Sequence, residues 1–194
     1  MANALDTAPI VTVRSRGELR AWLADHHGEK GPAWLASYRP HHPDFLGAEP
    51  ATEELLCWGW INSIPRALDA DRSMILISPR KPGSAWSAVN KRLVDQARAS
   101  GAMTPAGEAR IAAALADGSW SFLDDVERLE VPPDLAAALQ AEGQRATWDA
   151  WPRSVKRGTL EWIKTAKTEK TRTARIADVT ASAAQGQRPS PFRR

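Results

Sequence analysis

Residues 73–78, SMILIS, decide the fold class, because their four central side chains form an unbroken apolar run. A short run of this kind, bounded by the polar turn DADR (69–72) and by Pro79, predicts a strand that is covered on both faces. Residues 60–68, on the other side of the turn, predict a second strand. These two strands are predicted to pair in a small antiparallel sheet.

Two more strands precede them in the chain. The alternating stretch IVTV at 10–13 and the aromatic, alternating stretch AWLASYR at 33–39 both have strand character. Between them, apolar residues recur at helical spacing and predict a helix over 16–28. The N-terminal half therefore predicts a small sheet with helices.

Capping residues mark the next helices. Thr52, followed by two glutamates, is placed as the N-cap of a helix that ends at Gly59. Ser84 is placed as the N-cap of a helix that ends at Gly101. The face of that helix is predicted to hold Trp86, Val89, Leu93 and Ala97.

From residue 104 onward the chain predicts only helices. Thr104 and Pro105 have the order of an N-cap and a first helical residue, and Gly118 is suited to end that helix. Further helical segments are predicted at 132–143, 144–151 and, capped by Ser154, at 154–185. We predict an α+β fold with a mainly helical C-terminal half, organised as one domain over 1–186 with a basic tail at 187–194.

Composition narrows the class of protein. The 194 residues include nine tryptophans and a single cysteine, and 43% of them are hydrophobic. No apolar run approaches the ~20 residues that a membrane span needs, and no signal-peptide core is present near the N-terminus. One cysteine suits a reducing compartment. We therefore expect a cytoplasmic, globular protein without a transmembrane segment, as a monomer or a weak dimer.

The candidate site combines CWGWIN (57–62) with the loop that follows the SMILIS strand. Trp60 and Asn62 are two apart in a strand and lie on one face. The cationic loop leads into a predicted helix start, where unpaired N–H groups and the helix dipole favour anions. We predict a pocket for a phosphate or carboxylate, with these ligand-binding residues: Trp60, Asn62, Arg80, Lys81, Ser84, Trp86 and Asn90.

A purely structural interpretation of the same residues stays open. Trp86 is suited to a core, Ser84 to an ordinary cap, and Arg80 to neutralising Asp69 or Asp71. The histidine pairs at 26–27 and 41–42 lack metal-ligand spacing, and no nucleophile motif is present. We predict no catalytic residue, no metal site and no cofactor.

The C-terminal segment is the second candidate surface. Residues 153–194 contain eleven Lys or Arg and three Asp or Glu. Helical spacing predicts a basic surface made by Lys156, Lys164, Lys167 and Arg175. Such a face suits nucleic acid, without sequence specificity, or an acidic protein, but a solvated amphipathic helix is the more common explanation of such a charge run.

A family resemblance rests on several ordered blocks: GWIN at 59–62, SPRKPGSAWSAVN at 78–90, SGAMTPAGEARIAAALADGSW at 100–120, VPPDLAAAL at 131–139, WIKTAKTEKTRTARI at 162–176 and PF at 191–192. From about residue 17 to 192 the chain resembles the bacterial YdeI/OmpD-associated, or bacteriocin-protection, family. The resemblance implies an intracellular α+β protein connected with tolerance to bacteriocins, without a known reaction. Family members usually have GWID where this chain has Asn62, so a carboxylate-dependent activity would be lost here.

Three functions follow from these observations. The leading one is non-catalytic binding of a small anionic ligand in bacteriocin or antimicrobial stress. The second is an enzyme acting on a phosphorylated or acidic metabolite, for which Asp69 and Asp71 are the carboxylates nearest to Arg80 in sequence. The third is an interaction protein that uses its basic C-terminal helix.

Overall fold

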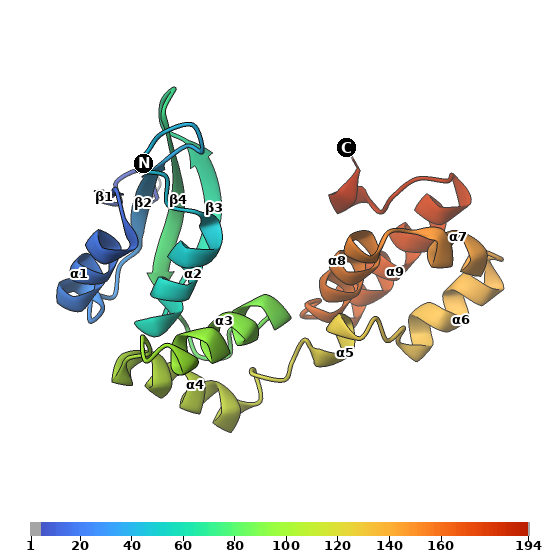
Figure 1. The fold of residues 1–194 in the computed structure, drawn as a ribbon. Coiled ribbons are helices and arrows are strands. Elements are labelled where there is room, and N and C mark those ends of the chain that lie inside the picture. Colours follow the sequence, from blue (N-terminus) through green and yellow to red (C-terminus); the bar gives the residue numbers. More distant parts are fainter. Residues whose placement is uncertain (1–4, 194) are drawn as a thin grey trace. The chain divides into compact units, whose positions relative to one another are not determined.

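The computed structural model describes residues 5–193 (Figure 1). The chain forms two compact units, and the boundary between them in the sequence lies between Phe122 and Leu123. Unit 1 holds the sheet and the helices before the boundary, and unit 2 contains only helices. The predicted α+β class with a helical C-terminal half is confirmed. Within the described residues, no helix is long and apolar enough to span a membrane.

Unit 1 is built on a four-stranded sheet. The strands lie in the order β1 (Ile10–Val13), β2 (Ala33–Tyr38), β4 (Arg72–Pro79) and β3 (Trp60–Ala67). As predicted, β3 and β4 are joined by a short polar turn, and β4 is antiparallel to both of its neighbours, β2 and β3. β1 instead runs parallel to β2, because the helix between them returns the chain to the same end of the sheet.

Two helices cover one face of this sheet. They are α1 (Arg16–His26) and α2 (Ala48–Cys57). Leu19 and Leu55 of these helices form one core cluster with Leu35, Trp60 and Ile77 of the strands, and all five side chains are at most 2% exposed. This apolar cluster supplies the packing that holds the helices on the sheet.

The start of α2 differs from the prediction. The helix begins after Gly47, and Thr52 lies inside it, where its hydroxyl donates to the carbonyl of Ala48 at 2.8 Å. Pro50 does not prevent this earlier start, because N–H groups of the first turn have no intrahelical acceptor. The predicted end is confirmed: Gly59 adopts φ +74° and turns the chain into β3.

The start of α3 (Ala88–Ala99) also lies later than predicted. Its N-cap is Ser87, whose hydroxyl accepts from the backbone N–H of Asn90 at 3.2 Å, and Ser84 belongs to the preceding loop. Trp86 therefore lies outside the helix, although it is buried against Leu93, and Val89 is 50% exposed. The predicted shared face of Trp86 and Val89 is wrong for this reason.

The helix α4 (Pro105–Asp117) follows the prediction. The Thr104 hydroxyl accepts from the N–H of Gly107, Pro105 is the first helical residue, and Gly118 closes the helix with φ +79°. Helices α2 and α4 approach closely at Gly107, where a Cβ atom would lie 2.4 Å from the carbonyl oxygen of Cys57. Only glycine fits at this contact.

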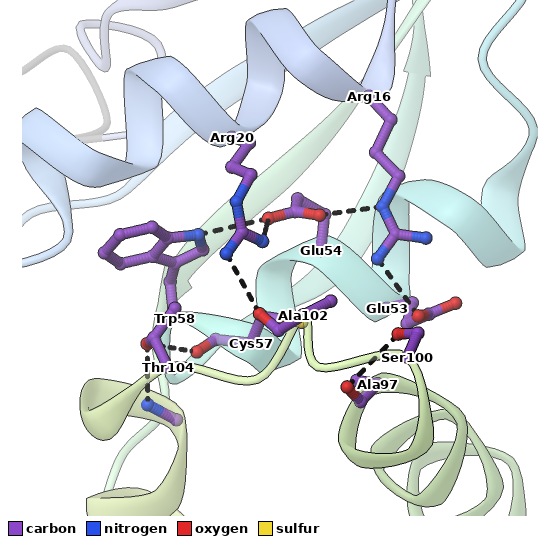
Figure 2. Close-up of polar contacts among 11 residues, drawn as sticks. Arg16, Arg20, Glu53, Glu54, Cys57, Trp58, Ala97, Ser100, Ala102 and Thr104 are labelled. Atoms are coloured by element: carbon purple, nitrogen blue, oxygen red, sulfur yellow. Dashed lines mark hydrogen bonds and ion pairs between the residues drawn. The ribbon is translucent and has the colours of Figure 1, made fainter.

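A buried carboxylate ties α1 to α2 (Figure 2). Glu54, with a side chain only 1% exposed, accepts from Arg16 Nε and Arg20 Nη1, both at 2.7 Å, and from Trp58 Nε1 at 3.1 Å. Arg20 also donates to the carbonyl of Ala102 in the turn before α4 at 3.1 Å. Both oxygens of Glu54 are used within the protein, so we assign this cluster to the structure of unit 1 and not to a ligand.

Unit 2 is a small helical bundle. Its elements are α5 (Asp124–Glu127), α6 (Pro133–Ala141), α7 (Arg145–Ala150), α8 (Arg153–Lys164), α9 (Glu169–Ala184) and the 3₁₀ turn η1 (Ser190–Phe192). The helix predicted from Ser154 is in fact two helices: α8 begins after Pro152, and Thr168 caps a separate α9. Helices α6, α7 and α8 all contact α9, which makes α9 the central helix of the unit.

The C-terminal segment folds back on these helices. The backbone N–H and hydroxyl of Ser190 donate to the carboxylate of Asp178 at 2.9 and 2.6 Å. The ring of Phe192 lies over Gly158, where an added Cβ atom would be 2.8 Å from the ring. Residues 190–192 are therefore an anchored part of unit 2.

Candidate functional site

Arg80, the first residue after β4, is the most unusual side chain of unit 1. Its backbone N–H donates to the carbonyl of Gly59 at 2.9 Å, and the residue is only 4% exposed. The guanidinium carbon lies 3.7 Å from the ring centroid of Trp86, and Nη2 donates to the carbonyl of Ala85. The side chain is thus held by an aromatic face and one carbonyl.

The charge of this guanidinium has no counterion within the described chain. Neither Nε nor Nη1 of Arg80 has a hydrogen-bond partner among residues 5–193, although both atoms are buried. Burial lowers the pKa of Arg80 to about 10, so the group is still protonated at neutral pH. A buried cation with two unpaired N–H donors is costly unless something else supplies the acceptor.

A small pocket, which encloses about 20 Å³, adjoins Arg80. The loop 80–86 forms one wall and the last two turns of α4, with the residues after it, form the other. Besides Arg80 the lining includes two cations, one carboxylate, two hydroxyls and an indole, namely Lys81, Arg110, Asp117, Ser84, Ser119 and Trp86. The pocket therefore has an excess of positive charge.

Asp117 shapes this loop. Its Oδ2 accepts from the N–H of Gly83 and its Oδ1 from the N–H of Ser119, both at 2.9 Å. Hydrogen bonds from the side chain and backbone of Ser119, and from the backbone of Gly83, lower the pKa of Asp117. The carboxylate is thus ionised and engaged with the backbone, which fixes the loop against α4.

The structure brings four of the seven predicted pocket residues together: Arg80, Lys81, Ser84 and Trp86. Trp60 is 1% exposed in the core, and its Nε1 donates to the carbonyl of His27 at 3.1 Å. Asn62 donates to Thr52 and lines a different pocket. Asn90 lies in the first turn of α3, which starts after Ser87, and it lines neither of these two pockets.

The carboxylates considered for an enzyme lie elsewhere. Asp69 and Asp71 occupy the turn before β4, whereas Arg80 follows its other end, about 25 Å away at ~3.3 Å per residue. Asp69 binds Arg72 Nη2 at 2.7 Å, and Asp71 contacts His41 at 3.2 Å. They neither neutralise Arg80 nor face its pocket.

Sequence reasoning missed the wall that α4 contributes. Arg110 and Asp117 are seven residues apart, which places them on one face of a helix, two turns apart. That spacing was available as a signal, but it does not show which surface the helix faces. The fold alone brings these residues to the Arg80 loop.

The predicted basic surface of unit 2 is largely engaged within the protein. Lys164 binds both carboxylate oxygens of Asp125 at 2.6 Å, and Lys156 donates to the carbonyl of Asp149 at 3.1 Å. Arg175 stacks over Trp162, with 5.2 Å to the ring centroid. Lys167 is exposed in the break between α8 and α9, which interrupts the continuous helical face that was expected.

No group of three or more His, Cys, Asp or Glu residues suited to a metal occurs among the described residues. Cys57, the free thiol, is buried, and its pKa is raised to about 11 by burial and then by the charge of Glu54. It is therefore protonated at neutral pH and poorly suited to act as a nucleophile.

Two family models match the chain. Residues 11–110 match a domain of unknown function (DUF8412), and residues 128–186 match the model described as "Bacteriocin-protection, YdeI or OmpD-Associated". The resemblance to the YdeI/OmpD-associated family is thus supported for a part of unit 2, while GWIN and the Arg80 loop fall in the other match. Comparisons with curated proteins and with solved structures return no match.

Proposed function

The chain belongs, through residues 11–110, to the family described as domain of unknown function DUF8412, and from this premise we propose that unit 1 binds a small anion at Arg80 without catalysing a reaction. The observation that carries the proposal is the buried guanidinium whose Nε and Nη1 have no acceptor within the described chain. An anion supplies both the acceptor and the opposite charge. Lys81 and Arg110 at the pocket wall add attraction.

The dimensions of the pocket define the ligand class. The enclosed space of about 20 Å³ lies far below the ~300–1,000 Å³ range of pockets for drug-sized ligands. We infer a phosphate-sized or carboxylate-sized group as the occupant. We propose no catalytic role for this site, because both oxygens of its lining carboxylate, Asp117, accept hydrogen bonds from backbone N–H groups.

The biological setting is part of the same proposal. The bacteriocin-protection description of the model matched at 128–186 supports a role in tolerance to bacteriocins or related stress, to which anion binding by unit 1 would contribute. We also propose a cytoplasmic location, in which the buried thiol of Cys57 stays reduced.

The test is ligand-dependent stability of wild type and Arg80→Met. Inorganic phosphate, titrated at constant ionic strength, is expected to stabilise the wild type by about 2.7 kcal/mol once its concentration reaches ~100 Kd. Arg80→Met should abolish this response. Without phosphate the variant should be at least as stable as wild type, because an unpaired buried charge is replaced by an apolar chain of similar length.

The matched control is Arg145→Met, which removes an exposed arginine of unit 2 that pairs with Asp149. It should retain the phosphate response in full. A phosphate response that persists in Arg80→Met would refute the site. A strong loss of stability of phosphate-free Arg80→Met would instead show that the arginine is structural.

A further inference from the structure

Unit 1 contains a second pocket, of about 210 Å³, that shares no lining residue with the Arg80 pocket. It lies beside α2, β2, β3 and β4, on the sheet face that α2 packs against; these elements are drawn together in Figure 1. This volume lies somewhat below the ~300–1,000 Å³ of pockets that hold drug-sized ligands, which points to a small organic ligand.

The floor of this pocket is the part of the sheet that α2 does not fully cover. Leu35 pairs with Ile75, and Ser37 pairs with Ser73, in the register of β2 and β4. Both pairs lie on the same sheet face, since they are two residues apart. The register shift between Asn62 and Pro65 in β3 places Pro65 opposite Ile75 and completes the floor.

The other walls are mainly apolar. Ala51 and Leu55 of α2 line one side, and Phe45 and Leu46 of the preceding loop line another. Phe45 is 45% exposed, so part of its ring faces solvent at the pocket. No Asp, Glu, Lys or Arg is among the lining residues. A charged ligand would therefore lose its hydration without gaining a partner.

The polar groups in the pocket have unused hydrogen-bonding capacity. Asn62 Nδ2 donates to Thr52 Oγ1 at 2.8 Å, and Thr52 Oγ1 in turn donates to the carbonyl of Ala48 at 2.8 Å. This chain fixes the amide, and its Oδ1 has no hydrogen bond to the described residues. The hydroxyls of Ser37 and Ser73 likewise make no hydrogen bond to the part of the chain that the structure describes.

We propose that this pocket binds an uncharged small molecule with an apolar body and a hydrogen-bond donor, which binds to Asn62 Oδ1. The site is independent of the anion at Arg80. The apolar walls provide most of the contact area, and Asn62 orients the ligand. Phe45 covers the part of the ligand nearest to solvent.

The test uses N-phenyl-1-naphthylamine, a neutral aromatic amine with one N–H donor, whose fluorescence rises in apolar surroundings. The full chain should bind it saturably with one site. Ala48→Trp adds an indole to the pocket wall, and this indole takes the space in which a ring of the probe would be buried. The lost burial should weaken binding at least about tenfold. Asn62→Leu should weaken binding about fivefold, the effect of one hydrogen bond.

Two controls separate the outcomes. Ala112→Trp makes the same change at an exposed position of α4 that lines neither pocket, and it should bind the probe as wild type does. Arg80→Met should also leave binding unchanged. Lack of saturable binding by wild type, or equal binding by Ala48→Trp and Ala112→Trp, would overturn the proposal. Unchanged binding by Asn62→Leu would overturn the assignment of the polar anchor.

Discussion

The clearest quantitative expectation concerns Glu54, the buried carboxylate shown in Figure 2. We consider Glu54→Gln, which keeps the shape of the side chain and removes its charge. The amide nitrogen must then face Arg16 or Arg20, so one of the two arginine hydrogen bonds is lost and the other is no longer charge-assisted. The Trp58 Nε1 donor competes for the single remaining oxygen.

The magnitude follows from the exposure of the partners. Breaking a buried ion pair costs about 3–5 kcal/mol when the remaining charge is stranded. Here the side chains of Arg16 and Arg20 are 36% and 40% exposed, so both can regain water. We therefore expect the lower end, about 3 kcal/mol. With an unfolding entropy of ~2.1 cal/mol/K per residue, a unit of roughly 120 residues would melt about 12 °C lower.

The matched control is Glu108→Gln. Glu108 also binds an arginine, Arg98, through two hydrogen bonds at 2.7 and 2.6 Å, but the two side chains are 44% and 42% exposed. An exposed pair is worth less than about 1 kcal/mol. The assay is urea unfolding of the full chain, with hydrogen exchange used to assign the transition of unit 1. Losses that agree within about 0.5 kcal/mol for the two variants would refute the argument from burial.

Two further expectations concern unit 1. Burial, and then the charge of Glu54, raise the pKa of Cys57 to about 11, so the folded state favours the protonated thiol. The protonated thiol therefore contributes to the stability of the fold below its ordinary pKa near 9, and this contribution is lost as the pH rises through 11. The difference in unfolding free energy between wild type and Cys57→Ala should therefore shrink from pH 8 to pH 11, and a constant difference would contradict the shift. Gly107→Ala should cost several kcal/mol in a thermal melt, because the added Cβ would lie 2.4 Å from the carbonyl oxygen of Cys57. Gly17→Ala in α1 is the control and should be neutral or stabilising, since its added Cβ would lie 3.8 Å from its nearest neighbour, Ser15 Oγ. Equal effects of the two substitutions would show that α2 and α4 can move apart.

Local signals in the sequence predicted the ends of several elements correctly. Gly59 and Gly118 end helices in the left-handed region, and Thr104 caps α4, because each uses a conformation or a hydrogen bond that few residue types provide. The N-caps at Thr52 and Ser84 were placed wrongly. Both residues are of a capping type, but the chain contains other starts nearby, at Gly47 and Ser87, and the packing of the helix decides between them.

The candidate site was predictable only where it is local. Arg80, Lys81, Ser84 and Trp86 are neighbours in sequence and line one pocket. The opposite wall comes from α4, about thirty residues later, and no spacing rule states which surface a helix will meet. Trp60 and Asn62 share a sheet face as expected, but the helices on that face separate them: the indole is in the core and the amide lines the second pocket.

The boundary between Phe122 and Leu123 has an evolutionary consequence. One family match ends before this boundary and the other begins after it, so each matched segment lies within one compact unit. Two such segments can be joined, separated or exchanged in gene rearrangements without cutting through a hydrophobic core. A relative recognised through one half is therefore informative about that half alone, and the bacteriocin-protection description comes from a model that matches only residues 128–186.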